Sequence, residues 1–141
     1  MANINSAMTG FMAKYNANDC VLQIGGKVIS GFGEDTMVTV SRDQDRATIT
    51  QDAQGTGVLS VNNKDLSTIT VNISEASPDA KYLSDLCENL NEFPIDLRTS
   101  TFHYWGSYCL VIKDPDYSVG AQASNLAFQI KAVNLHKEST R

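Results

Sequence analysis

The sequence has few of the residues from which metal sites and disulfide frameworks are built. It contains 2 histidines and 3 cysteines in 141 residues. A zinc site needs several cysteine, histidine or carboxylate ligands at compact spacing, but His103 and Cys109 are a lone pair that no second pair completes. We therefore expect no metal and no cofactor. Because Cys20, Cys87 and Cys109 are odd in number and widely spaced, we expect reduced thiols in a cytosolic compartment.

Long apolar runs are missing as well. No stretch approaches the roughly 20 apolar residues that a membrane-spanning helix requires. Residues 1–18 lack the basic start and the apolar core of a signal peptide. We therefore expect no membrane partner for this chain.

Positive charge is scarce. The chain has 11 lysines and arginines against 16 aspartates and glutamates, which gives a net charge of -5. A protein that holds nucleic acid tightly usually presents a basic patch, and the longest basic clustering here lies within residues 136–141. The composition therefore argues against DNA binding as the main task, and it is compatible with weak repulsion of nucleic acid.

The sequence contains only those combinations of potential catalytic residues that any chain of this size contains by chance. Ser107, His103 and Asp114 could form a nucleophile–base–orienter triad, but no serine lies in a nucleophile elbow. Asp45 and Asp52 flank one predicted strand and could form a carboxylate pair, although turn aspartates more often cap backbone N–H groups. We expect that the chain is not an enzyme.

What the sequence does contain is a run of four short predicted strands between Thr36 and Ile73, separated by polar turns. Apolar residues alternate with hydroxyl and amide residues, as in strands that bury one face. We expect a sheet whose apolar face is buried and whose polar face meets water or a passing solute. The predicted polar face consists of Thr39, Thr48, Thr50, Ser60, Thr68, Thr70 and Asn72.

The rest of the chain predicts further strands and one helix. Gly25-Gly26 supplies the turn of a hairpin spanning residues 20–30. Ser77 is expected as the helix N-cap and Pro78 as the first helical residue, followed by an apolar stripe. That stripe is Leu83, Leu86, Cys87 and Leu90, and the later strands are expected at residues 95–101, 107–113 and 125–135, before a polar tail at 136–141. We therefore expect a single mainly β domain over residues 1–141, a sandwich or barrel of about eight strands with the helix at one end or edge.

Several structural motifs follow one another along the chain in a fixed order. They are Tyr15-Asn16, Gly31-Phe32-Gly33, the segment 35–43, the turn Asp52-Ala53-Gln54-Gly55 and the helix start Ser77-Pro78. This order resembles the short tail-tube proteins of contractile-tailed bacteriophages, a family also found in phage-derived bacteriocins. The resemblance covers residues 14–90 at the level of motifs and nearly the whole chain as an order of elements. Gln54-Gly55-Thr56 replaces a more acidic turn, and no basic residue follows Val58, so a specific salt bridge between rings is not implied.

The resemblance implies a structural subunit of a contractile tail. Homohexameric rings would stack into a hollow inner tube in the virion, after assembly in the bacterial host cytoplasm. The implied partners are further copies of the chain and the sheath, baseplate and tail-terminator proteins. DNA would pass only transiently and non-specifically, and in a bacteriocin the tube would stay empty.

Under this interpretation the predicted polar face lines the lumen, and subunit strands join edge to edge, because a closed ring pairs otherwise open sheet edges. Contacts between rings are expected from an N-terminal arm (residues 1–18) and from exposed loops and turns. The candidate residues are Phe11, Phe32, Glu34, Asp35, Arg42, Asp43, Asp52 and Gln54.

The residues alone leave one alternative open, a β-barrel module that binds a small ligand or a carbohydrate. Threonine-rich faces and Trp105 could line its pocket. The aromatic cluster at Phe102, Tyr104, Trp105 and Tyr108 could also stack nucleic-acid bases, but it lacks interleaved lysine or arginine, which favours packing in the core or between subunits.

Overall fold

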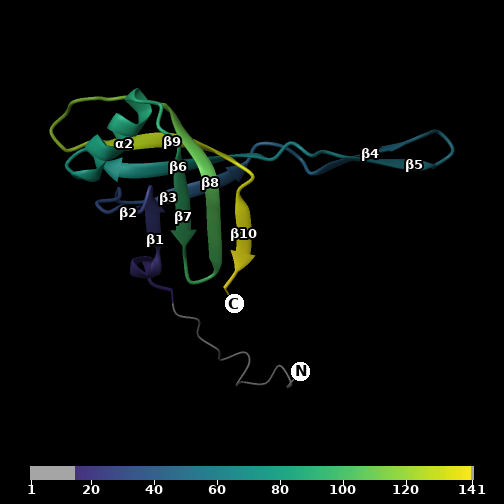
Figure 1. Ribbon diagram of the computed structural model, residues 1–141, viewed down its shortest axis with the longest axis horizontal. Coiled ribbons are helices and arrows are strands. Elements are labelled where there is room, and N and C mark those ends of the chain that lie inside the picture. Colours follow the sequence, from purple (N-terminus) through teal and green to yellow (C-terminus); the bar gives the residue numbers. More distant parts are fainter. Residues whose placement is uncertain (1–14, 141) are drawn as a thin grey trace, which may run out of the picture.

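The computed structural model describes residues 15–140. Figure 1 shows a body of crossing strands that carries one α-helix, and a two-stranded hairpin that projects away from the body. The helical elements are the short 3-10 helix η1 (Ala17–Asp19) and α2 (Asp79–Glu88). The strands are β1 (Val21–Ile24), β2 (Lys27–Val28), β3 (Val38–Arg42), β4 (Ala47–Gln51), β5 (Gly57–Val61), β6 (Leu66–Ser74), β7 (Phe93–Arg98), β8 (Phe102–Lys113), β9 (Asn125–Val133) and β10 (His136–Ser139).

Eight of these strands form one antiparallel sheet in the order β2-β1-β7-β8-β9-β6-β3, with β10 paired to β8. Strand β8 joins two parts of this sheet, because its first half pairs with β7 and β10 and its second half pairs with β9. In Figure 1, β6 and β9 run across the view while β7 and β8 cross them. The structure thus confirms the predicted mainly β architecture with one helix.

The core lies between these crossing parts of the sheet and α2. On β6, Ile69, Val71 and Ile73 are fully buried and alternate with half-buried polar residues. Phe128 on β9 and Leu83 on α2 pack into the same cluster. Burial of one such side chain contributes about 1.5–3 kcal/mol, so this cluster accounts for much of the stability of the fold.

The helix is confirmed, with small differences at both ends. It begins at Asp79, and Pro78 takes the N-cap position without a side-chain hydrogen bond. The hydroxyl of Ser77 still accepts the backbone N–H of Asp79 at 3.3 Å, but it also donates to the carbonyl of Ser30 at 2.8 Å. Leu90, predicted as the last residue of the apolar stripe, lies beyond the helix with a φ of 50° and is 68% exposed.

The predicted four-stranded run from Thr36 to Ile73 does not form one sheet. Strands β3 and β6 pair within the large sheet, whereas β4 and β5 form a separate two-stranded sheet. At the base of the hairpin, Asn62 N–H donates to the Arg46 carbonyl at 2.8 Å and closes the pairing of β4 with β5. Alternation in the sequence identifies strands and faces, but it does not say which strands pair.

Two further differences concern the second half of the chain. Strand β8 begins at Phe102 instead of Ser107, and the expected polar tail contains strand β10 from His136 to Ser139. Strand β10 is exposed along its whole length, and backbone pairing with residues Phe102–Trp105 of β8 holds it in place. No helix within residues 15–140 is both long and apolar enough to cross a membrane.

Candidate functional site

The face of β3, β6 and β9 that points away from the core is polar. Thr39 on β3 lies directly opposite Thr70 on β6, and Thr70 lies opposite Gln129 on β9. Thr68 and Asn72 share this face because the residues that alternate with them are buried. The structure therefore places four of the predicted polar-face residues together on one surface.

The charged groups at this face neutralise one another. The ammonium of Lys131 donates to the Asp43 carboxylate at 2.6 Å and to the Thr68 hydroxyl at 2.6 Å. The Thr68 hydroxyl in turn donates to the other oxygen of Asp43 at 2.7 Å. Hydrogen bonds from Lys131 and Thr68 hold the pKa of Asp43 below its usual range, so this carboxylate is charged at neutral pH. The cation of Lys131 is thus already matched within its own chain.

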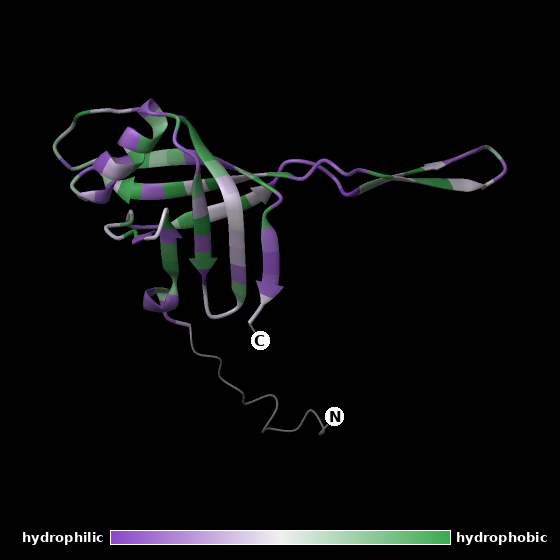
Figure 2. Ribbon diagram, in the orientation of Figure 1, coloured by the Kyte–Doolittle hydropathy of each residue, from purple (hydrophilic) through white to green (hydrophobic). Residues whose placement is uncertain are grey.

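The hairpin formed by β4 and β5 has two different faces. Ala47 pairs with Val61 and Ile49 with Leu59 on one face, while Thr48 pairs with Ser60 on the other. The apolar face is open to water, since Ile49 is 74%, Leu59 62% and Val61 67% exposed. Figure 2 shows these hydrophobic strand segments far from the body of the protein. Thr48, Thr50 and Ser60, expected on one sheet with Thr39, thus lie together on a separate sheet.

Hydrogen bonds at the tip and at the root of the hairpin hold β4 and β5 in register. At its tip, one carboxylate oxygen of Asp52 accepts the backbone N–H groups of Gln54 and Thr56, each at 2.9 Å. Gly55, with a φ of 91°, supplies the left-handed backbone of this turn. At the root, the side-chain amide of Asn62 donates to the Asp45 carbonyl at 3.0 Å. An isolated two-stranded sheet is marginally stable in water, and its exposed apolar face is of the kind that marks a contact surface.

The amino-acid sequence shows to which family this chain belongs. The family model described as "Bacteriophage PhiTE tail tube protein" matches residues 12–140. The chain belongs to this tail tube family. No curated protein sequence gives a significant match.

Solved structures from contractile injection systems share the fold of this tail tube protein. A chain of the extracellular contractile injection system PVC sheath-tube complex in the extended state aligns with a TM-score of 0.66 and 11% identity, covering 96% of this chain and 99% of that chain. The PVC sheath/tube terminator in the extended state gives 0.65 and 11%, with coverage of 90% and 98%. The anti-feeding prophage cap, a tube terminating cap, gives 0.65 and 8%, with coverage of 92% and 94%. At sequence identities this low, the similarity shows a shared fold and nothing more.

The loop before β3 contains three of the predicted contact residues of the tail tube protein. Glu34 and Asp35 are exposed. Phe32 is half-buried, packs against the core of its own chain and forms an isolated bridge with Ile73. Phe11, also predicted as a ring contact, lies outside the described residues. The loop thus offers two exposed carboxylates, while Phe32 packs inside its own subunit.

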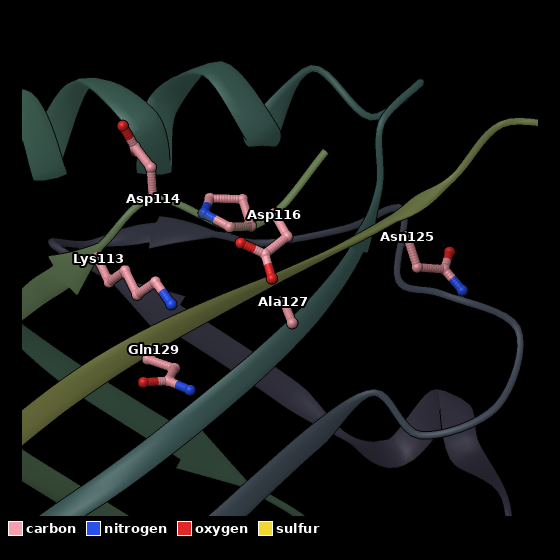
Figure 3. A pocket seen from close by; sticks show the side chains of 7 residues that line it. Lys113, Asp114, Asp116, Asn125, Ala127 and Gln129 are labelled. Carbon is pink, nitrogen blue, oxygen red and sulfur yellow. The ribbon is translucent and has the colours of Figure 1, made fainter. Parts of the chain in front are cut away.

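Two shallow hollows open on the surface of the described chain. The smaller one, about 230 Å³, lies where β8 ends and β9 begins, and Figure 3 shows the side chains that line it. Asp114 in this hollow points toward α2. The larger hollow, about 640 Å³, lies at the root of the hairpin. Trp105 lines neither hollow. Its ring lies against that of His103 at 4.7 Å and that of His136 at 5.4 Å between centroids.

The residues considered for catalysis are engaged elsewhere. His103 Nε2 lies 2.7 Å from Asp96 on the neighbouring strand, and Asp114 lies beside the thiol of Cys87 instead. Asp45 and Asp52 stand at opposite ends of β4, so the strand separates them. Within residues 15–140 no group of three or more ligands could hold a metal ion.

The three thiols are free and shielded. Cys109 is buried, and burial raises its pKa to about 11. Burial also raises the pKa of Cys20, while burial and then the nearby charge of Asp114 raise that of Cys87. Thiols of this kind stay protonated near neutral pH, and a protonated thiol is a poor nucleophile. The expectation of buried or half-buried free cysteines is confirmed.

Proposed function

We propose that this tail tube protein forms homohexameric rings, that the rings stack into a hollow tube, and that the polar face of β3, β6 and β9 lines its lumen. The subunit is structural and not catalytic. The observation that carries the proposal is the projecting hairpin, which leaves Ile49, Leu59 and Val61 in water. Covering an exposed apolar face of this kind is favourable at about 25 cal/mol per Å², and a neighbouring subunit can cover it.

The polar face suits a lumen wall. Hydroxyl and amide groups at Thr39, Thr70 and Asn72 hydrate well and carry no positive charge that would hold phosphate. Lys131 is already paired with Asp43, and the net charge of -5 disfavours adhesion of DNA. DNA would therefore pass transiently, without being held, or the lumen would stay empty in a bacteriocin.

The proposed setting follows the named structural neighbours. Those structures are a sheath-tube complex, a sheath/tube terminator and a tube-terminating cap. By analogy, this chain would contact sheath, baseplate and terminator proteins in a virion or phage-like particle assembled in the host bacterial cytoplasm.

Substitution on the hairpin tests the assembly. The change Ile49→Asp places a charge on the apolar face, and burying that charge against a neighbour is costly. We expect the variant to fold normally, because Ile49 does not contact the core, and to lose about tenfold or more of its tube yield, scored by negative-stain electron microscopy.

The matched control is Val58→Asp, which introduces the same charge on the opposite face of the same hairpin. Val58 is 58% exposed and lies among hydroxyl residues, so this variant should assemble nearly as the unmodified chain does. Equal tube yields for both variants would show that the apolar face makes no contact in the tube.

A further inference from the structure

The larger hollow at the root of the hairpin is basic, although the whole chain is acidic. It is lined by one carboxylate, that of Asp65, and by four lysine and arginine side chains together with one histidine. Its cations are Arg42, Arg46, Lys64 and Lys137, and the histidine is His136. We call this hollow the basic groove. The groove holds more than a third of the 11 lysines and arginines of the chain, so positive charge is concentrated here.

Three of the four cations form no ion pair within residues 15–140, and one of these three, Lys137, lies over the rings of Phe102 and Tyr104. Arg42 already has partners within the chain, since its guanidinium donates to the Ser67 hydroxyl at 3.0 Å and to the Leu135 carbonyl at 2.8 Å. Within the described residues, the ion pairs do not include Arg46 or Lys64. Both side chains are exposed. The basic groove therefore presents free positive charge to whatever occupies it.

Free negative charge gathers at the other end of the body. Figure 1 shows α2 and the loop after β8 at the end opposite the hairpin. This acidic end carries carboxylates that form no ion pair within the described residues, although Lys81 and Lys113 lie among them. They are Asp85, Glu88, Glu92, Asp114 and Asp116. Asp114 and Asp116 are exposed and belong to the loop that lines the smaller hollow, where Figure 3 labels both.

The basic groove is continuous with the apolar hairpin face. Val61 belongs to that face and also lines the groove. One occupant that covers both surfaces must offer carboxylates and apolar contact area, which a protein does. Nucleic acid would neutralise Arg46 and Lys64 but would leave Ile49 and Leu59 in water. The continuity therefore favours a protein occupant with an acidic end.

We propose that the basic groove receives the acidic end of the next copy of this chain, with Arg46 and Lys64 facing Asp114 and Asp116. The inference rests on the proposed tube, and it names the surfaces that join successive subunits along it. A contact between two different ends of the same chain is heterologous, and such contacts repeat into an open stack when the rotation between copies does not close a ring. Complementary charge at the two ends also fixes the direction in which each copy adds.

Charge reversal tests this pairing. The groove variant is Arg46→Glu with Lys64→Glu, and the acidic-end variant is Asp114→Lys with Asp116→Lys. All four positions are exposed, so unfolding temperatures should stay near that of the unmodified chain. Each double variant opposes like charges, and we expect rings by native mass spectrometry but about tenfold fewer tubes by electron microscopy.

A chain that carries all four substitutions distinguishes charge pairing between subunits from a general effect of altered charge. A chain with all four substitutions opposes unlike charges again, and its tube yield should return to within about twofold of the unmodified chain. A control with Arg98→Glu reverses one charge at an exposed site on β7 that lies outside both the groove and the acidic end. It should keep its tubes, and tubes of the unmodified chain should weaken as salt rises.

The outcomes distinguish this inference from the proposed function. If the unmodified chain forms neither rings nor tubes, the proposed function fails. If it forms tubes and both double variants form them equally well, only the pairing is overturned. Failure of the fourfold variant to recover while remaining folded also overturns it. A third result also overturns the pairing: the groove variant loses binding to a DNA duplex while its tube yield stays unchanged. The groove would then bind nucleic acid instead of the next subunit.

Discussion

At the scale of single residues, Asp79 ties the start of α2 to the hairpin of β1 and β2. Its carboxylate is buried, pairs with the Lys27 ammonium at 2.9 Å and accepts the backbone N–H of Ser30 at 2.8 Å. Burial raises the pKa of this carboxyl, but the hydrogen bonds from Lys27 and Ser30 and the charge of Lys27 outweigh burial, so the pKa lies below its usual range. Asp79 is therefore charged at neutral pH and stabilises the folded state.

The change Asp79→Asn should destabilise the subunit by about 1–3 kcal/mol at pH 7, because a charged hydrogen-bond acceptor is lost from a buried position. A folded-state pKa below the unfolded value of about 3.9 gives stability that is present above about pH 4 and is lost as pH falls through the folded pKa. Urea unfolding at pH 7 and near pH 3 would measure this.

The matched control is Asp85→Asn, an exposed carboxylate on the same helix, which should change stability by less than about 0.5 kcal/mol. A difference between Asp79→Asn and the unmodified chain that stays constant down to pH 3 would contradict the role of the ionised carboxylate.

The contacts of a single residue explain one of the glycine motifs in the sequence. Gly31, part of the Gly31-Phe32-Gly33 motif, has a φ of 78°, and a Cβ there would lie 2.5 Å from the Ser77 hydroxyl oxygen. Only glycine fits this backbone and this close approach. The sequence could identify the motif, but the neighbour that requires it is 46 positions away and becomes visible only in the fold.

At the scale of elements, β9 carries the largest fully buried side chain, Phe128, beside the exposed Gln129. Truncation of Phe128 to alanine removes apolar contacts and leaves a cavity, which costs about 3–5 kcal/mol in a well-packed core. We expect this loss in urea unfolding of the isolated subunit. Gln129→Ala on the opposite face of the strand should cost less than about 0.5 kcal/mol, and equal losses for the two variants would contradict the described core.

Strong periodic patterns made some elements predictable. The alternation in β6 identified both its buried and its polar face, and Ser77-Pro78 located the helix within one or two residues. The positions of Thr48 and Thr50 on a separate hairpin were not predictable, because alternation identifies strands and their faces but does not say which strands pair.

The C-terminal strand shows why another part was missed. His136–Ser139 is polar and exposed on every residue, so it lacks the alternation by which a strand is recognised. Its stabilising contacts come from β8, where Lys137 lies 4.3 Å above the ring of Phe102. The basic groove was missed for a different reason, since its residues come from three separate stretches of the chain that only the fold brings together.

At the scale of the whole molecule, three surfaces have different characters. The face of β3, β6 and β9 is polar with its charges paired, the hairpin presents apolar side chains, and the two ends of the body carry opposite charge. These three features are what a repeating hollow assembly needs: a wall that does not hold its cargo, a contact that excludes water, and a direction of growth.

The most direct test of the central claim is a cryo-EM structure of tubes assembled from the unmodified chain. We predict hexameric rings in which Thr39, Thr70 and Asn72 face the axis and Ile49 and Leu59 are covered by a neighbouring subunit. A tube with those three polar side chains on its outer surface or buried between subunits would contradict the claim, as would a chain that remains monomeric under all assembly conditions.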